Sequence, residues 1–202
     1  MNNRRQDFLI INSIVEPNSK VLDVGCDDGS LLQMLQDTKN VDSRGIELFS
    51  DKVNICLAKG LSVVQGDADH DLAMYPENSF DFVILSKTLQ SMQQPVETLK
   101  ELLRIGKYAI VSIPNFGHWR VRYYLSLFGR MPVTPSLPAT WYNTENIHLC
   151  TINDFIQLCF ELNIEILQSI ALDNKGRQLN FANRFWSVNL MGEQAIFLLK
   201  KK

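Results

Sequence analysis

The residues best suited to chemistry lie in a short loop that follows an apolar run. Residues 20–24 (KVLDV) are typical of a buried strand, and residues 25–29 (GCDDG) lead into a helix that begins near Ser30. Glycine permits a tight turn, so backbone N–H groups and the helix N-terminus can approach a polar ligand closely. The dinucleotide fingerprint GxGxxG would need glycine where Asp27 and Ser30 stand. The loop therefore predicts a ligand site and disfavours NAD as its ligand.

Two later segments add polar residues in the order that a nucleoside site needs. Glu47 ends the second short strand-like run, at residues 43–47, where a carboxylate can accept hydrogen bonds from both hydroxyls of a ribose. Gly66, Asp67 and Ala68 follow the next run, at residues 61–64. The three segments together favour a nucleoside ligand.

The elements that must position these residues alternate along the chain. Helical spacing between short apolar runs predicts an α/β fold with strands at residues 20–24, 43–47, 61–64, 80–85, 108–113, 165–171 and 194–199. A first helix is expected to end before Pro17, and Thr151 is typical of a helix N-cap. We expect a single domain over residues 1–202, with an insertion at about 114–150 that serves as a lid or an interface.

This order of segments resembles the motifs of class I S-adenosylmethionine-dependent methyltransferases. Asp23, Gly25 and Gly29 match the first motif, an acidic residue followed by GxGxG, and residues 79–83 (SFDFV) resemble the fourth-strand motif. The resemblance implies a doubly wound seven-stranded sheet, mostly parallel with the last strand antiparallel, and helices on both faces. It also implies S-adenosylmethionine or S-adenosylhomocysteine as the cofactor, bound by Asp23, Gly25, Cys26, Asp27, Gly29, Glu47, Leu48, Asp67, Ala68 and Ser86.

Asp27 departs from that motif, which has glycine at its middle position. The Asp27 side chain adds a Cβ and a negative charge where the backbone would pass the methionine carboxylate, and like charges repel at short distance. We therefore expect Asp27 to weaken cofactor binding and Asp27→Gly to strengthen it. The alternative is that an arginine of the 114–150 segment neutralises Asp27.

The 114–150 segment is rich in proline, aromatic residues and arginine. Two aromatic pairs, Trp119 with Tyr123 and Tyr124 with Phe128, have the i,i+4 spacing of a helix, which is more typical of core packing than of ligand binding. Three arginines are balanced only by Glu145. Arginine suits carboxylates and phosphates, and it is enriched with Trp and Tyr at interfaces. With a solvated surface as the alternative, we assign to a substrate or partner site Asn115, His118, Trp119, Arg120, Arg122 and His148.

Composition disfavours several other functions. The formal net charge of −2 argues against a protein that coats nucleic acid or an anionic membrane, and no apolar run is long enough to span a bilayer. The average hides an asymmetry, because residues 1–113 carry 11 basic and 16 acidic side chains whereas residues 114–202 carry 9 and 6. Four scattered cysteines without a CxxC pair predict reduced thiols and a cytoplasmic protein.

Other catalytic and metal-binding patterns are weak. Asp67, Asp69, His70 and Asp71 are close in sequence, but they lack the spacing of a calcium or zinc site and are expected to form a solvated loop without a metal. No GxSxG elbow is present, which disfavours acyl transfer by this chain itself. The fourth strand ends in Ser86 and Lys87 rather than in a motif used to methylate nucleic-acid bases.

Four segments bear a more specific resemblance. Residues 84–90 (ILSKTLQ), 114–122 (PNFGHWRVR), 129–134 (GRMPVT) and 146–152 (NIHLCTI) are similar to signatures of the MetW family of bacterial methionine-biosynthesis proteins. The resemblance implies a role in making methionine, with homoserine O-acyltransferase (MetX) as the partner.

Two functions remain open after this comparison of motifs. One is a subunit that binds S-adenosylmethionine and regulates the acyltransferase. The other is an active methyltransferase, in which residues 114–150 close over a small-molecule acceptor. The motifs identify no catalytic residue, so they leave open whether the chain is an enzyme.

Overall fold

The computed structural model describes residues 6–134, 137–145, 147–179 and 185–202. Within these residues the chain forms one eight-stranded sheet with helices packed against it. The strands are β1 (Lys20–Val24), β2 (Asp42–Glu47), β3 (Ser62–Gln65), β4 (Phe80–Ser86), β5 (Gly106–Pro114), β6 (Ile164–Leu172), β7 (Gln178–Leu179) and β8 (Gln194–Lys201). The helices are α1 (Gln6–Ile14), α2 (Ser30–Lys39), α3 (Ser50–Ala58), α4 (Ala68–Asp71), α5 (Pro95–Ile105), α6 (Trp119–Phe128), α7 (Ile152–Glu161) and α8 (Phe185–Met191), with short 3₁₀ turns η1 (Leu72–Met74) and η2 (Leu89–Ser91).

The strand order is β3-β2-β1-β4-β5-β8-β6-β7, and β1 to β5 are paired in parallel. β8 lies antiparallel to both β5 and β6, as predicted for the last strand. The expected seven strands are all present, but the number is wrong by one. The additional strand, β7, has two residues and pairs with the end of β6. It lies in the connection between β6 and β8, where no strand is predicted from the sequence.

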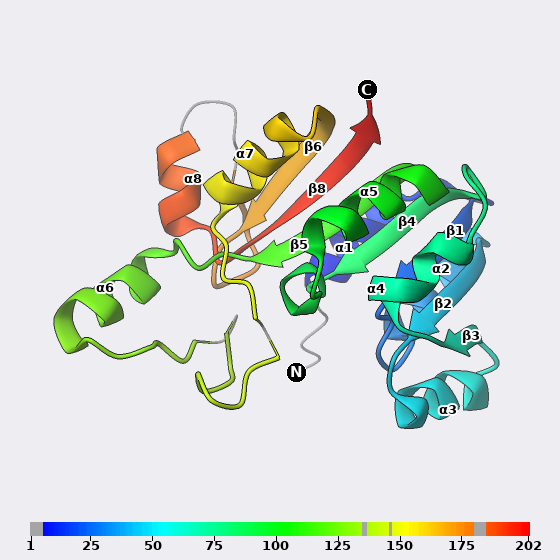
Figure 1. Cartoon of the computed structure of the whole chain (residues 1–202), viewed down its shortest axis with the longest axis horizontal. Helices are drawn as coiled ribbons and strands as arrows, with labels where there is room; N and C mark the ends of the chain where they lie inside the picture. The colour runs from blue at the N-terminus through cyan, green and yellow to red at the C-terminus, as the bar shows by residue number, and fades with distance from the viewer. Residues whose placement is uncertain (1–5, 135–136, 146, 180–184) are drawn as a thin grey trace.

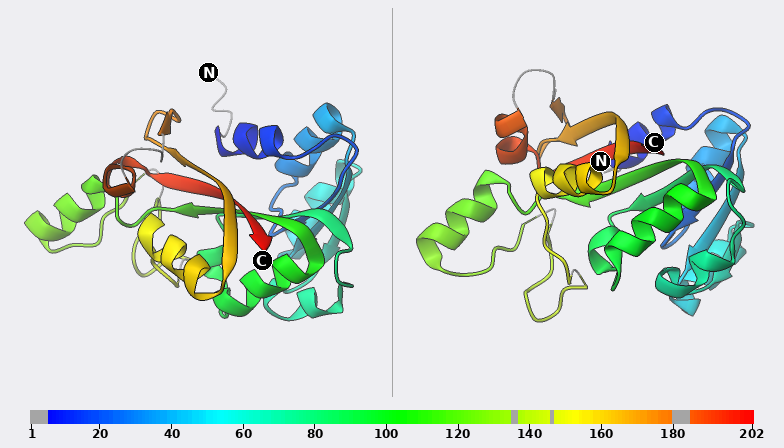
Figure 2. Two further views of the ribbon diagram at one scale, coloured as in Figure 1. Left: turned by 90° about the horizontal axis from the view of Figure 1, so that it is seen from above. Right: turned by 45° about the horizontal axis from the view of Figure 1, so that its top comes forward.

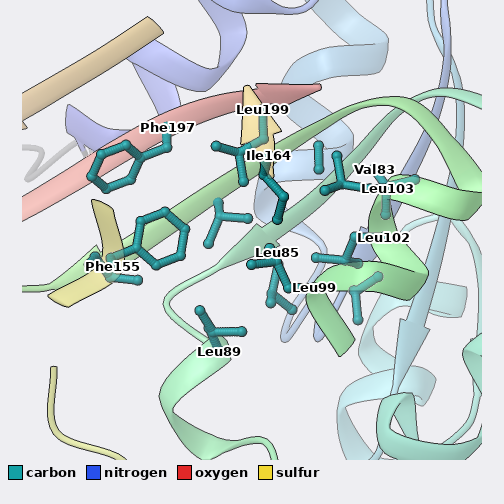
Figure 3. Close-up of a cluster of buried hydrophobic side chains, with 14 of the residues drawn as sticks. Val83, Leu85, Leu89, Leu99, Leu102, Leu103, Phe155, Ile164, Phe197 and Leu199 are labelled. Carbon is teal, nitrogen blue, oxygen red and sulfur yellow. The ribbon is translucent and has the colours of Figure 1, made fainter. Parts of the chain in front are cut away.

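Helices cover both faces of the sheet, and Figure 2 shows α1 on one side and α5 and α7 on the other. Strand residues alternate between the faces, so neighbouring β8 residues belong to different cores: Ile196 packs with α1 and α2, and Phe197 with α5 and α7. Figure 3 shows the second core, in which the rings of Phe155 and Phe197 lie 4.6 Å apart. These two cores hold the strand ends in fixed positions.

Helix starts follow the local sequence. Thr151 caps α7 as predicted, and a full capping box forms because the Asp154 carboxylate accepts a hydrogen bond from the Thr151 N–H.

The 114–150 segment leaves the end of β5, forms α6 and returns to α7. Figure 1 shows α6 extending away from the sheet. Among the described residues, no helix is long and apolar enough to cross a membrane.

Candidate functional site

A cavity of about 740 Å³ opens at the carboxyl ends of β1, β2, β3 and β4. Open parallel sheets bind ligands at this edge, where the strand order reverses. Nine predicted cofactor residues line it: Asp23, Gly25, Cys26, Asp27, Glu47, Leu48, Asp67, Ala68 and Ser86. Gly29 does not. It has a φ of 74°, and a side chain there would collide with Leu61 and Cys56, so this glycine permits the turn and the packing of α3.

Glu47 is the best-placed polar group of the cavity. Its carboxylate is buried, with Oε2 accepting from the Asp27 N–H at 2.8 Å and Oε1 accepting from the Phe49 N–H at 3.1 Å. An ionised carboxylate offers about four acceptor positions, so both oxygens keep one for a ligand. The apolar side chains of Leu48 and Phe49 are about half exposed beside it. This combination fits a ribose next to a flat ring.

Gly25 brings the first loop into contact with the end of β4. Its φ is 71°, and a Cβ at this position would lie 2.9 Å from Cγ2 of Thr88. The Gly25 N–H donates to the Ile46 carbonyl, which fixes the loop to β2. Only glycine satisfies the backbone angle and the close approach together.

The N-terminus of α2 is already occupied by an acidic side chain. Asp28 accepts hydrogen bonds from the Ser30 N–H at 3.0 Å and from the Ser30 hydroxyl at 2.6 Å, and it forms an ion pair with Lys59. These contacts hold the pKa of Asp28 below its ordinary value, although burial acts in the opposite direction. A pyrophosphate would need this helix end, so the arrangement favours a ligand without phosphate.

Asp27 has a left-handed backbone, with a φ of 50°, and its charge is balanced by α3. The Asp27 Oδ1 lies 2.8 Å from Nζ of Lys52. This contact raises the pKa of Lys52. The alternative to weakened cofactor binding was neutralisation of Asp27 by an arginine of the 114–150 segment, and the structure places a lysine of α3 beside Asp27 instead.

Carboxylates outnumber lysines around the cavity. Among the described residues that line it, seven carry a carboxylate and two are lysines. One of the two lysines is Lys52, and the other, Lys87, forms an ion pair at 3.1 Å with Asp7 of α1. The excess negative charge also affects Cys26, whose pKa is raised by burial and further by Asp23. The cavity thus favours a ligand with positive charge.

The acidic loop after β3 uses its carboxylates to hold the chain. Asp67 caps α4, and Asp71 accepts a hydrogen bond from the Asp67 N–H. Asp69 accepts from the N–H groups of Gln93 and Gln94, which ties this loop to the rim after η2. Among the described residues, no three His, Cys, Asp or Glu side chains gather where they could hold a metal ion.

The 114–150 segment differs from the expectation of core packing. Trp119, Tyr123, Tyr124 and Phe128 do form one helix, α6, but all four are exposed. Tyr124 and Phe128 instead pack on each other, with ring centroids 5.2 Å apart. The helical spacing was read correctly, and the inference of core packing was wrong because α6 extends away from the sheet. Further along, the exposed apolar side chains are Met131, Val133, Trp141, Tyr142, Ile147 and Leu149.

None of the six residues assigned to a substrate or partner site lines the cavity. Asn115 is fully buried, and its amide donates to the carbonyls of Asn189 and Gly192 while its Oδ1 accepts from the N–H groups of Gly117 and Ile152. Asn115 therefore joins the start of the segment to α8 and α7.

The other five residues of that set lie around α6 and the end of the segment. His118 is buried and caps α6, and burial lowers its pKa. The Arg122 side chain donates to the Gly117 carbonyl, and Arg120 lies 3.8 Å from Glu193. Trp119 and His148 are exposed.

Several cavity residues escaped the sequence reasoning. Six of them are Phe8, Phe49, Lys52, Thr88, Met92 and Glu145, and of these six Thr88 alone lies in a segment with a recognised motif. Lys52 could have been found as the cation one helical turn into α3, facing the loop that carries Asp27. Glu145 offered no signal, because its place depends on how the long segment folds back.

Comparison with solved structures identifies the fold. A SAM-dependent methyltransferase from Thermotoga maritima matches with a TM-score of 0.68 and 17% identity, over 98% of this chain and 88% of that one. The [4+2]-cyclase SpnF matches with a TM-score of 0.67 and 18% identity, over 98% and 80%. Because a cyclase shares the architecture, these likenesses show a class I methyltransferase fold and leave the reaction open.

Comparison with known sequences is more specific. The bifunctional methionine biosynthesis protein MetXA/MetW of Rhodopirellula baltica is 31% identical, over 95% of this chain and 32% of that protein. The demethylmenaquinone methyltransferase of Renibacterium salmoninarum is 28% identical, over 64% and 57%. The chain thus spans about a third of the first relative and just over half of the second. The family model described as methionine biosynthesis protein MetW matches residues 5–199. This protein therefore belongs to the MetW family of methionine biosynthesis proteins.

Proposed function

We propose that the cavity binds S-adenosylmethionine or S-adenosylhomocysteine. The observation that carries the proposal is Glu47, a buried carboxylate on the cavity wall with an acceptor position left on each oxygen. Glu47 would accept the ribose hydroxyls, and Leu48 with Phe49 would contact the adenine ring. Asp23 would face the amino group of the methionine portion. When bound, S-adenosylmethionine would supply a methyl group on a positively charged sulfur, which suits a wall rich in carboxylates.

Isothermal titration calorimetry tests this proposal directly. S-adenosylmethionine and S-adenosylhomocysteine are titrated into the protein, with ATP as a phosphate-bearing control. We expect saturable binding of one or both adenosyl ligands and none of ATP. The absence of heat with both adenosyl ligands would contradict the proposal.

We further propose that this chain acts with homoserine O-acyltransferase as its regulatory subunit. The MetXA/MetW relative, by its name, unites two methionine-biosynthesis proteins in a single chain. The 114–150 segment presents exposed Trp141 and Tyr142, neither of which lines the cavity, and such aromatic side chains are common at the centres of interfaces. An adenosyl ligand in the cavity would then report the level of the pathway's product to the acyltransferase.

Co-purification of the two proteins, followed by acyltransferase assays with and without this chain, tests the regulatory role. We expect a complex, a change in acyltransferase activity and a further change on adding S-adenosylmethionine. Replacing Trp141 and Tyr142 by Ala should weaken the complex at least tenfold while leaving adenosyl binding intact. A protein that neither binds nor affects the acyltransferase would contradict the regulatory role.

A second function is supported by one specific contact. Glu145, from the 114–150 segment, reaches the cavity wall, as a residue of a lid over a methyl acceptor would. A methyltransferase needs chiefly an aligned nucleophile, so the lack of an obvious base is compatible with this function. Turnover of methyl-labelled cofactor into a small metabolite would establish it.

A further inference from the structure

The turn η2 stands between the cavity and the 114–150 segment. Thr88, which precedes the turn, lines the cavity, and so do Ser91 and Met92 at its end. Gln90, in the middle of the same turn, does not line the cavity and is buried. One short element therefore contacts a ligand site with some residues and the interior with another.

Gln90 is bonded to both ends of the 114–150 segment. Its backbone carbonyl accepts hydrogen bonds from the N–H groups of Ile147 at 2.9 Å and His148 at 3.0 Å. Its side-chain amide donates to the Pro114 carbonyl at 3.0 Å and to the sulfur of Cys150 at 3.1 Å. A shift of η2 thus moves both the Gln90 carbonyl and the Gln90 amide, which together position residues 147–150.

The cavity residues fix η2 from either side. Before the turn, Thr88 packs so closely on Gly25 that a single Cβ on the glycine would lie 2.9 Å from it. After the turn, the N–H groups of Gln93 and Gln94 donate to Asp69, another residue of the cavity wall. The Gly25 loop and Asp69 therefore connect the cavity wall directly to the two ends of η2.

We propose that the side-chain amide of Gln90 couples ligand binding in the cavity to the 114–150 segment. Gln90 acts as a positioning residue, and residues 147–150 are the part of the segment that responds. The proposal rests on the proposed function, since it takes S-adenosylmethionine as the ligand, and it adds the route by which that ligand would alter residues 147–150 of the 114–150 segment. Coupling between two sites is reciprocal, so a partner bound to the segment would change the affinity for S-adenosylmethionine by the same factor.

Hydrogen–deuterium exchange with and without saturating S-adenosylmethionine tests the coupling. In the wild-type protein we expect the ligand to slow exchange at residues 25–29 and, about tenfold, at residues 147–150. In Gln90→Met, which keeps the length of the side chain but has no amide, residues 25–29 should be protected as before. Protection of residues 147–150 by the ligand should fall below about twofold.

Gln157→Met, on the exposed face of α7, is the matched control and should behave as the wild type. Cys150→Ala removes one acceptor of the Gln90 amide and should reduce the coupling partially, whereas Cys150→Ser keeps an acceptor and should restore most of it. The Cys150 pair also decides the question if Gln90→Met does not fold.

The outcomes separate the two proposals. If S-adenosylmethionine protects no segment of the wild-type protein, the proposed ligand is wrong. If residues 25–29 are protected and residues 147–150 respond equally in the wild type and Gln90→Met, the cavity site stands and the role of the Gln90 side-chain amide is refuted, because the substitution leaves the Gln90 backbone carbonyl in place. Failure of residues 147–150 to respond in the wild type refutes the coupling itself.

Discussion

The cavity and the 114–150 segment are held in place in different ways. Most cavity residues lie at or just after the ends of the parallel strands β1 to β4, so their positions depend on the strands before them. The 114–150 segment depends on contacts between distant residues, such as Asn115 with Gly192 and Gln90 with Cys150. Substitutions should therefore affect ligand binding in the first region and folding or communication in the second.

Asn115→Ala should have the largest effect on stability. The substitution removes the Asn115 amide, so the carbonyls of Asn189 and Gly192 lose a donor. It also removes the Asn115 Oδ1, so the N–H groups of Gly117 and Ile152 lose an acceptor. Because each buried group left without a partner costs roughly 1–3 kcal/mol, we expect a loss of about 4 kcal/mol. Denaturant titration measures this loss in the free energy of unfolding. Asn153→Ala, at an exposed position, should cost less than about 0.5 kcal/mol. Similar losses for both would show that the Asn115 contacts contribute little.

Glu47→Gln should act chiefly on ligand binding, although the amide also loses one of the two backbone hydrogen bonds that the Glu47 carboxylate accepts from Asp27 and Phe49. The amide has one acceptor oxygen in place of two, so one of the proposed ribose hydrogen bonds is lost together with the negative charge. Hydrogen bonds to charged groups are worth roughly 1.5–3 kcal/mol, which corresponds to a loss of affinity for S-adenosylmethionine of about 10- to 100-fold. Calorimetry measures this loss. Glu16→Gln, at an exposed position, should bind as the wild type, and unaltered affinity in Glu47→Gln would remove the ribose role.

A double-mutant cycle on Asp27 and Lys52 sharpens the account of the first loop. The ion pair at 2.8 Å already offsets the Asp27 charge, so Asp27→Gly should strengthen binding only about threefold. In a Lys52→Met background the charge is exposed to the ligand, and the same substitution should strengthen binding about tenfold. Equal effects in both backgrounds, measured by calorimetry, would show that Lys52 does not shield the ligand from Asp27.

The smallest expected effect concerns Glu193, at the base of α6. Burial raises the pKa of this carboxyl, and Arg120 at 3.8 Å offsets only part of the shift. A raised pKa in the folded state gives stability below the unfolded pKa that is lost as the pH rises through the folded pKa. Glu193→Gln should therefore raise the melting temperature at pH 7 by about 3 °C, and the difference should shrink towards pH 4. A difference that grows on acidification would contradict this assignment.

The two regions also differ in how far the sequence predicts them. Asp23, Glu47 and Asp67 could be placed because each lies in or just after a short predicted strand, and parallel strands bring their carboxyl ends to one edge. The exposure of Trp119 and Tyr123 could not be predicted, because helical spacing does not reveal whether the rest of the molecule covers that helix. Gln90 gave no signal by type, since its importance arises from partners up to 60 residues away. The strand β7 was missed because two residues form no period.

The Asp28 carboxylate at the N-terminus of α2 has a consequence for ligand selectivity. A helix N-terminus normally attracts phosphates, and cells contain many adenine nucleotides that carry them. Here Asp28 occupies that end, and a wall with seven acidic and two basic residues surrounds the space next to it. ATP, ADP and NAD would each bring negative charge into this field. The proposed adenosyl site would thus discriminate among adenosine-containing metabolites by net charge, before any contact with the base is made.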